Sequence, residues 1–505
     1  WDVSSGTDFS GMFSVALSFN GQLTQWDVSS GTDFSRMFSQ TTFNPNISGW
    51  DVSSGTDFSR MFQGSSFNSD ISKWDVSFGT DFSRMFYFAR SFNTDISQWD
   101  VSSGTDFSGM FEGATFNSII SQWDVSSGMD FSRMFHEARS FNTDISQWDV
   151  SSGMDFSNMF SRAGFFNSNL SQWDVSSGTD FSSMFGSSSY FNSDISNWNV
   201  SSGIDFNNMF SSARSFNSDI SQWDVSSGTD FSSMFSDATG FNGDISNWDV
   251  SKGTNFGGMF KNAESFLTDI SQWDVSSGTD FNSMFQSRTF NSNISQWDVS
   301  SGNDFSGMFQ GSLFNSNIST WVVSSGTDFS RMFSDAELFN SDLSLWDVSS
   351  GTDFSHMFSD ADSFNTDISL DFRGVFSQTT FNPNITGWDV SSGTDFSDMF
   401  FSATSFNSDL SRWDVSLGNF FSGMFQLAES FDANISQWDV SSGTDFSGMF
   451  QDATYNTDIG DAAFNSNISQ WDVSSGTDFS RMFAGAEFFN SDLSQWDVSS
   501  GIDFS

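Results

Sequence analysis

Residues 92–111 read FNTDISQWDVSSGTDFSGMF, and close copies of this stretch recur along the whole chain. Tryptophan marks the copies, because most successive Trp residues are 24 or 25 positions apart. The Trp positions are 1, 26, 50, 74, 99, 123, 148, 173, 198, 223, 248, 273, 297, 321, 346, 388, 413, 438, 471 and 496. A short unit copied many times is typical of a solenoid. We therefore expect residues 1–505 to form a single repeat solenoid of about 21 units of 24–25 residues.

Two units depart from this period. The step after Trp346 contains a unit truncated near 368–376, and the step after Trp438 carries an insertion near 455–463. The chain also begins and ends inside a repeat, so we expect its true termini to lie outside this sequence.

The composition excludes several classes of protein. The 505 residues include 67 Phe, 20 Trp and no Cys, and the formal net charge is -47. A polyanion of this size is repelled by nucleic acid and by anionic membranes, so we expect neither as a partner. Without Cys there is no disulfide scaffold and no thiolate metal site. No apolar run is long enough for a membrane span.

Within one unit, two hydrophobic periods follow each other. Ile47, Trp50 and Val52 are separated by polar residues and predict a strand with one buried face. Phe58, Met61 and Phe62 stand at i, i+3 and i+4, which predicts a short helix. The sequence thus predicts an α/β solenoid of leucine-rich-repeat-like coils, each adding one strand to a parallel sheet and one short helix. The alternative is a parallel β-helix with several strands in each coil.

The unit FNSDISQWDVSSGTDFSxMF resembles the BspA-like leucine-rich-repeat surface proteins, in particular their mycoplasma-type branch with a repeat of about 25 residues. The resemblance covers essentially the whole chain. It implies a secreted or cell-surface protein, often adhesive, and it brings no catalytic residue. This chain has GTDFS where many relatives have a longer turn, so a shared ligand does not follow.

Two columns of aspartate recur from unit to unit. Carboxylates stacked at the spacing of neighbouring strands repel one another, so hydroxyl groups, turn amides or bound cations must relieve the charge. Oxygen-rich sites suit Ca²⁺, and the alternatives are capping of the turn and a solvated acidic face. No cofactor is required, and Ca²⁺ is a candidate. The candidate residues are Asp2, Asp27, Asp51, Asp75 and Asp100 after Trp, and Asp8, Asp33, Asp57, Asp81 and Asp106 in the turn.

Eight Asn residues begin the pattern N-x-[ST], which is a glycosylation acceptor in a secreted eukaryotic protein. The alternative is an exchange of Asn for Asp at a position where either side chain bonds the backbone. These residues are Asn46, Asn169, Asn199, Asn293, Asn317, Asn384, Asn434 and Asn467.

No catalytic constellation is visible, and we expect no enzyme. The two histidines, His136 and His356, lie about nine coils apart, and Cys is absent. The favoured function is an extracellular or cell-surface structural or adhesive repeat protein that binds a cell-surface partner or its own copies head to tail in filaments. The alternative is an acidic surface that binds Ca²⁺, a mineral or a cationic partner.

Overall fold

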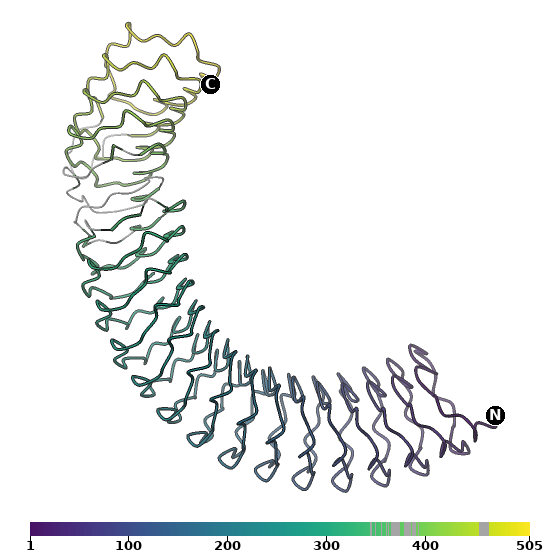
Figure 1. Cartoon of the computed structure of the whole chain (residues 1–505). Coiled ribbons are helices and arrows are strands. Elements are labelled where there is room, and N and C mark those ends of the chain that lie inside the picture. The colour runs from purple at the N-terminus through teal and green to yellow at the C-terminus, as the bar shows by residue number, and fades with distance from the viewer. Residues whose placement is uncertain are drawn as a thin grey trace. The chain divides into compact units, whose positions relative to one another are not determined.

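The computed structural model describes residues 1–343, 393–453 and 464–505, and between them 346–348, 350–354, 356–359, 361, 363–364, 374–377, 385 and 390–391. The chain divides into two compact units, Trp1–Gly253 with Asn262–Thr268, and Thr254–Lys261 with Asp269–Ser505. Within each unit, successive repeats form coils that lie against one another (Figure 1). The chain is therefore a repeat protein. The insertion near 455–463 and most of the truncated unit near 368–376 lie outside the described residues.

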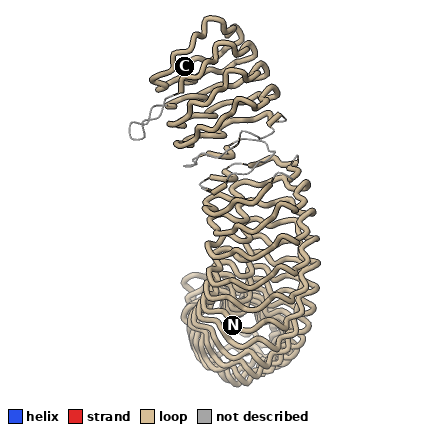
Figure 2. Tube along the Cα trace, turned by 90° about the vertical axis from the view of Figure 1, so that its left-hand side faces the viewer, coloured by secondary structure: helices blue, strands red, loops and turns tan. Residues whose placement is uncertain are grey.

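The described residues contain no helix, and their only strand-like pairings are isolated bridges, so Figure 2 draws them as loop. The predicted helix and sheet in each repeat are therefore wrong, and so is the alternative of several strands in each coil. The same residues hold no helix of the length and apolar character that crossing a membrane requires.

The segment 58–63 shows why no helix forms. The amides of Phe58, Arg60 and Phe62 donate to carbonyl oxygens of the next coil, at N···O distances of 2.8–2.9 Å. Between them, the Met61 amide donates to the Phe58 carbonyl at 3.2 Å, three residues back, as in a turn. Arg60 has a φ of 55°, which an α-helix does not allow. Alternate amides thus tie one coil to the next, while Phe58, Met61 and Phe62 still point into the core.

Parallel pairing occurs at the Gly-Thr-Asp turn and not at the Trp-Asp-Val segment where the sheet was expected. Asp57 forms isolated parallel bridges with Asp33 on one side and Asp81 on the other. The amides of Thr56 and Asp57 both donate to the Thr32 carbonyl of the preceding coil, at 2.8 and 3.2 Å. In most of the described coils, one residue is therefore paired in this way.

The Trp-Asp-Val segment is short because a turn closes each end of it. The Trp74 amide donates to the Ile71 carbonyl at 3.1 Å, and the Gly79 amide donates to the Val76 carbonyl at 2.8 Å. The indole Nε1–H of Trp74 donates to the Ile47 carbonyl of the preceding coil at 3.2 Å. On this side of the coil, the Trp side chain makes the hydrogen bond to the preceding coil. In a sheet, a backbone amide would make it.

Aromatic columns fill the inside of each unit. Phe58 stacks on Phe82 with ring centroids 5.7 Å apart and planes 6° apart, and Trp74 stacks on Trp99 at 6.5 Å and 4°. Phe58 and Phe82 have no exposed surface. Equivalent pairs in the second unit are Phe281–Phe305 at 5.6 Å and Trp413–Trp438 at 6.3 Å. Because rings occupy the interior of these coils, their function must depend on the outer surface.

The aromatic columns continue across the insertion. Trp438 stacks on Trp471 at 6.3 Å and 4°, and Phe431 stacks on Phe464 at 5.7 Å and 14°. These values are those of ordinary neighbours, although the residue numbers differ by 33. The coils on the two sides of the insertion therefore pack as consecutive coils.

Candidate functional site

Asp-x-Ser turns, up to three in a repeat, determine what the coil presents outside. Residues 51–53, 57–59 and 70–72 read DVS, DFS and DIS. In each, the Asp Oδ1 accepts a hydrogen bond from the amide of the Ser two residues later, at 2.8–3.0 Å. The apolar residue between them is buried. The turn therefore turns one apolar side chain inward and leaves a carboxylate on the outer side.

The Asp column after Trp is fully exposed. Asp2, Asp27, Asp51, Asp75 and Asp100 each accept the amide of the following Ser at 3.0–3.1 Å. The Ser53 hydroxyl, and then its amide, hold the pKa of Asp51 below its ordinary value. The charges of Asp51 and Asp2 act to raise the pKa of Asp27, but the two bonds from Ser29 outweigh them. Serine thus relieves the repulsion within the column.

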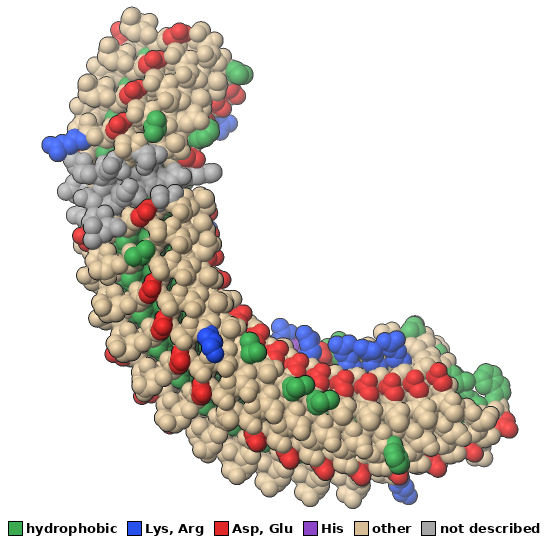
Figure 3. Space-filling model, viewed as in Figure 1, with side chains coloured by type: hydrophobic (Ala, Val, Ile, Leu, Met, Phe, Trp, Pro, Cys, Tyr) green, Lys and Arg blue, Asp and Glu red, His purple; other side chains and the backbone are tan. Residues whose placement is uncertain are grey.

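The turn column is more sheltered. Asp8 is exposed, but Asp33, Asp57, Asp81 and Asp106 are half-buried, and each accepts a Ser amide at 2.8 Å. The predicted capping role is therefore present, although the capped element is a turn and not a helix. Burial raises the pKa of Asp130 and of Asp205 in the same column. Figure 3 shows acidic side chains in lines that run from one coil to the next.

These columns do not form clusters of the kind that hold a metal. Over the part of the chain that the structure describes, no three side chains of His, Asp or Glu come together as a potential metal site. Each carboxylate of the predicted Ca²⁺ columns instead bonds its own serine. Calcium binding at these columns stays a prediction.

The candidate glycosylation residues occupy the same kind of turn as aspartate. Asn46 Oδ1 accepts the Ser48 amide at 2.9 Å, as Asp70 Oδ1 accepts the Ser72 amide at 2.9 Å one coil later. The second residue of this bond is the Ser of the N-x-[ST] pattern, so the turn alone explains the pattern. Asn169, Asn199, Asn293, Asn317, Asn434 and Asn467 make the same bond at 2.9–3.1 Å. Asn384 lies outside the described residues.

Hydroxyl groups of the recurring Ser-Ser-Gly-Thr stretch tie coils together. Ser54 Oγ donates to the Ser29 carbonyl at 2.9 Å, and Thr56 Oγ1 donates to the Thr32 carbonyl at 3.2 Å. The sequence analysis did not predict these bonds between coils. The signal was their recurrence one period apart, which places a hydroxyl beside the same backbone group in every coil.

The charged pairs of the first unit join neighbouring coils. Arg162 Nη1 lies 2.7 Å from Glu137 Oε1, and Arg133 Nη1 lies 3.7 Å from Glu112 Oε1. Burial lowers the pKa of His136, whose Nε2 is 3.9 Å from Glu137. His136 belongs to the first compact unit and His356 to the second.

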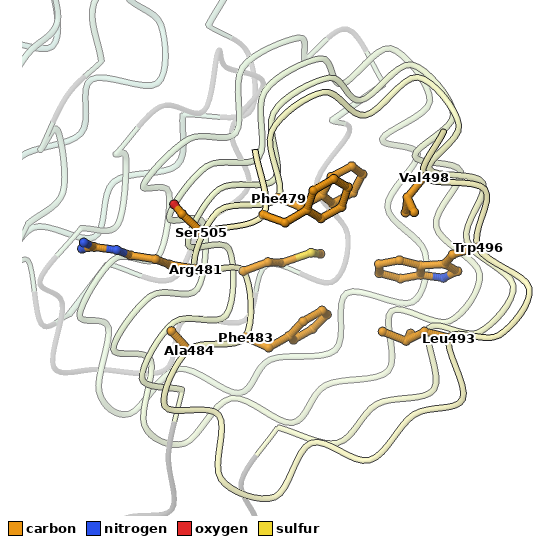
Figure 4. Close-up of a pocket in the computed structure, with 10 residues that line it drawn as sticks. Phe479, Arg481, Phe483, Ala484, Leu493, Trp496, Val498 and Ser505 are labelled. Carbon is orange, nitrogen blue, oxygen red and sulfur yellow. The ribbon is translucent and has the colours of Figure 1, made fainter. Parts of the chain in front are cut away.

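The last coil of the second unit has an apolar groove of about 510 Å³. It is lined by Phe479, Met482, Phe483, Leu493 and Trp496. Figure 4 shows the side chains of Phe479, Phe483, Leu493 and Trp496 pointing into the same space. In earlier coils the equivalent residues are buried under the coil that follows. The groove is therefore lined by the residues that a neighbouring coil covers elsewhere in the stack.

Comparisons with known proteins identify a family, but neither the curated proteins nor the solved structures add to it. No curated protein matches the sequence. A solved structure titled "Crystal structure of TLR13-ssRNA13 complex" aligns with 85% of this chain and 68% of its own, at 11% identity and a TM-score of 0.16. A likeness at that TM-score carries no argument about fold or function.

The protein family described as "Mycoplasma protein of unknown function, DUF285" matches repeatedly. The matched residues are 1–95, 39–119, 80–196, 113–219, 179–289, 281–373, 369–461 and 459–505. They confirm the mycoplasma-type repeat, whereas the closer identity as a BspA-like surface protein stays a prediction. Since the matches together span the whole sequence, the chain belongs to the DUF285 family of mycoplasma proteins of unknown function.

Proposed function

We propose that this chain is an extracellular or cell-surface repeat protein with a structural or adhesive role. The observation that carries the proposal is the division between a filled interior and a repeated exterior. The cores of the described coils are occupied by stacked rings, while the outside presents the same acidic turns in nearly every repeat. A surface of this kind suits many weak contacts to one partner better than one deep site.

The adhesive form of the proposal is tested with the post-Trp column. Substituting Asn for Asp51, Asp75, Asp100, Asp124 and Asp149 removes five charges but keeps an oxygen that can accept the Ser amide. We expect beads coated with the variant to attach to host cells several-fold less than beads coated with the parent chain, and the difference to shrink as salt is added.

The control is a chain in which Asn46, Asn169 and Asn317 are changed to Asp, which adds charges in a different column. Equal attachment of the parent and the five-Asn variant would exclude the acidic column as the contact surface. Attachment of the parent no greater than that of albumin-coated beads would exclude adhesion altogether.

The structural form of the proposal is end-to-end association into filaments. The near-identity of the coils supports it, because one coil packs on the next with the same ring geometry, as Phe111 does on Phe86 and Phe135. Electron microscopy of the intact natural protein tests it. Filaments longer than one chain would support it, and monomers alone at high concentration would contradict it.

The alternative function is binding of Ca²⁺ or a cationic partner along the acidic columns. The observation in its favour is the repulsion that Asp51 and Asp2 exert on Asp27, which a cation would relieve. It predicts a higher melting temperature in Ca²⁺ than in chelator, and loss of that difference in the five-Asn variant. Equal melting in both solutions would contradict it.

A further inference from the structure

One position of the repeat departs from its usual residue in two adjacent coils. The residue before the Phe-Asn pair is Ser or Thr in most repeats. In several described repeats its hydroxyl donates to a carbonyl of the preceding coil. Examples are Thr115 to Arg90 at 2.8 Å and Ser265 to Thr239 at 2.6 Å. Two adjacent coils between these examples carry Phe165 and Tyr190 at this position, and neither can make that bond as Ser or Thr does.

The two rings lie outside the core and on each other. Phe165 is 63% exposed and Tyr190 is 60% exposed. Their centroids are 5.8 Å apart and their planes differ by 10°. Exposed rings contribute less hydrophobic stabilisation than the buried Phe and Trp rings do. These two positions also lack the hydroxyl hydrogen bond to the preceding coil. Together they form a flat apolar platform, which folding of the repeat does not require.

The platform borders a pocket of about 400 Å³ with basic and hydroxyl groups around it. Arg139 and Arg162 line it from the adjoining coils, and Ser187 and Ser189 add hydroxyls. Gly164 keeps the space open, since a Cβ at this position would have no atom within 4 Å. Arginine, hydroxyl groups and an aromatic face are thus gathered in one concave site.

The stretch that contributes Arg139 and Arg162 is richer in basic residues than the rest of the chain. Eight of the 16 Lys and Arg residues lie between positions 36 and 162, in a chain of net charge -47. The largest group of basic side chains in Figure 3 lies on the first compact unit, which also contains this pocket. The bond from Arg162, joined by the charge of Arg139, holds the pKa of Glu137 below its ordinary value. Glu137 fixes Arg162 in place, and Arg139 supplies a second positive charge at the pocket.

We propose that this pocket binds an acidic sugar. The apolar face of the sugar ring would lie on Phe165 and Tyr190, and its carboxylate would lie against Arg139 and Arg162. Ser187 and Ser189 offer hydrogen bonds to the ring hydroxyls. A polyanion is excluded as the favoured ligand because the acidic columns repel it at long range, so the site fits a sugar with one negative charge. The site is local and does not depend on the proposed adhesive role of the acidic columns.

The test compares sugars that differ in one group. Methyl β-D-glucuronide carries a carboxylate where methyl β-D-glucoside carries a hydroxymethyl group, and the methyl glycoside of N-acetylneuraminic acid is a second acidic probe. Binding to the whole chain is measured by calorimetry and by saturation-transfer NMR. We expect at least one acidic sugar to bind about tenfold or more tightly than the neutral glucoside.

The variants return the site to the residues of other coils. Phe165→Ser with Tyr190→Ser should abolish binding of the acidic sugar without lowering the melting temperature, because Ser stands at this position in neighbouring coils. Arg139→Ser should remove the preference for the acidic over the neutral sugar. Phe488→Ser is the matched control, because Phe488 occupies the same repeat position in another coil and is 53% exposed.

Four outcomes would overturn the proposal. They are equal affinity for glucuronide and glucoside, no binding of either acidic sugar at tens of millimolar, unchanged binding in the Phe165→Ser/Tyr190→Ser variant, and an equal loss in Phe488→Ser. Saturation of the pocket by an acidic peptide that the sugars do not displace would also reject a sugar as the ligand.

Discussion

In a regular coil, the central phenylalanine meets its two neighbours in the same way. Phe111 lies 5.7 Å from Phe86 and 5.7 Å from Phe135, with planes 7° apart on both sides. The two contacts are equal because the coils before and after have the same length and the same turns. In a regular coil, the ring distance and the angle between ring planes are thus the same on both sides.

The shortened coil has unequal contacts. Phe376, which occupies the position of Phe111, lies 5.7 Å and 3° from Phe400 but 6.1 Å and 25° from Phe358. Its sequence lacks the Trp-Asp-Val-Ser-Ser-Gly-Thr stretch of a complete repeat. Phe376 therefore still stacks on both neighbouring rings in a repeat that lacks this stretch, but it is tilted relative to one of them.

The largest expected effect comes from removing the central ring. Phe111→Ala should lower the free energy of unfolding by about 3–5 kcal/mol, because a fully buried ring with two parallel neighbours is lost. Phe376→Ala should cost less, because one of its contacts is already tilted. Urea unfolding combined with hydrogen exchange resolves the effect coil by coil.

Phe78→Ser is the control for this pair, because Phe78 is 65% exposed where the next repeat has Ser103. It should leave stability nearly unchanged. If Phe376→Ala and Phe111→Ala lowered the free energy of unfolding equally, the tilt of the Phe376 ring would have no effect on stability.

A smaller effect is expected from blocking the turn that the shortened coil lacks. A Cβ on Gly104 would lie 2.5 Å from Phe107 Cζ and 3.0 Å from the Val101 carbonyl oxygen. Gly104→Ala should therefore displace the ring and cost about 1–3 kcal/mol. Gly164→Ala is the matched control, since nothing lies within 4 Å there. Equal melting temperatures of the two variants would show that the turn does not set the ring position.

The smallest effect concerns one Asp-x-Ser turn and its pH dependence. The Ser102 hydroxyl, and then its amide, lower the pKa of Asp100, so its ionised form is favoured by folding. This stabilisation is present above the unfolded pKa of about 3.9 and is lost as pH falls through the lower folded pKa. Asp100→Ala should cost up to about 1 kcal/mol at pH 7, by analogy with a cap, and the difference from the parent should shrink in strong acid.

Asp100→Asn separates charge from hydrogen bonding in this turn, because the amide oxygen still accepts the Ser102 amide. Its stability relative to Asp100→Ala should not change with pH. Melting curves between pH 2 and 7 measure all three chains, and a constant gap between parent and Asp100→Ala down to pH 2 would contradict the predicted pKa shift.

The sequence was sufficient for the period and for the residues that face inward. Phe58, Met61, Phe62, Trp50 and Val52 are all buried, as their spacing predicted. The backbone conformation was not predictable from the same spacing, because i, i+3 and i+4 fit a run of turns as well as a helix. What decides between them is that alternate amides find carbonyls in the next coil, and one repeat read alone does not contain that partner.

The outer surface was predicted in part for a similar reason. The exchange of Asn and Asp was visible, and Asn46 does make the bond that Asp70 makes. The common Asp-x-Ser pattern was missed because each aspartate was assigned to its own column, although the Ser two residues later was the shared signal. Phe165 and Tyr190 were also visible as departures from Ser, but only the structure shows that their rings stack.

The tryptophan column has an optical consequence. From Trp50 to Trp248, consecutive indoles lie 6.2–6.5 Å apart with planes at most 5° apart. At such spacing, excitation absorbed by one indole can pass to its neighbours before light is emitted. The intrinsic fluorescence of this unit is therefore a property of the column and not of single residues. A quencher attached to one coil would lower the Trp fluorescence of several neighbouring coils. The number of coils affected would measure how many consecutive coils remain stacked.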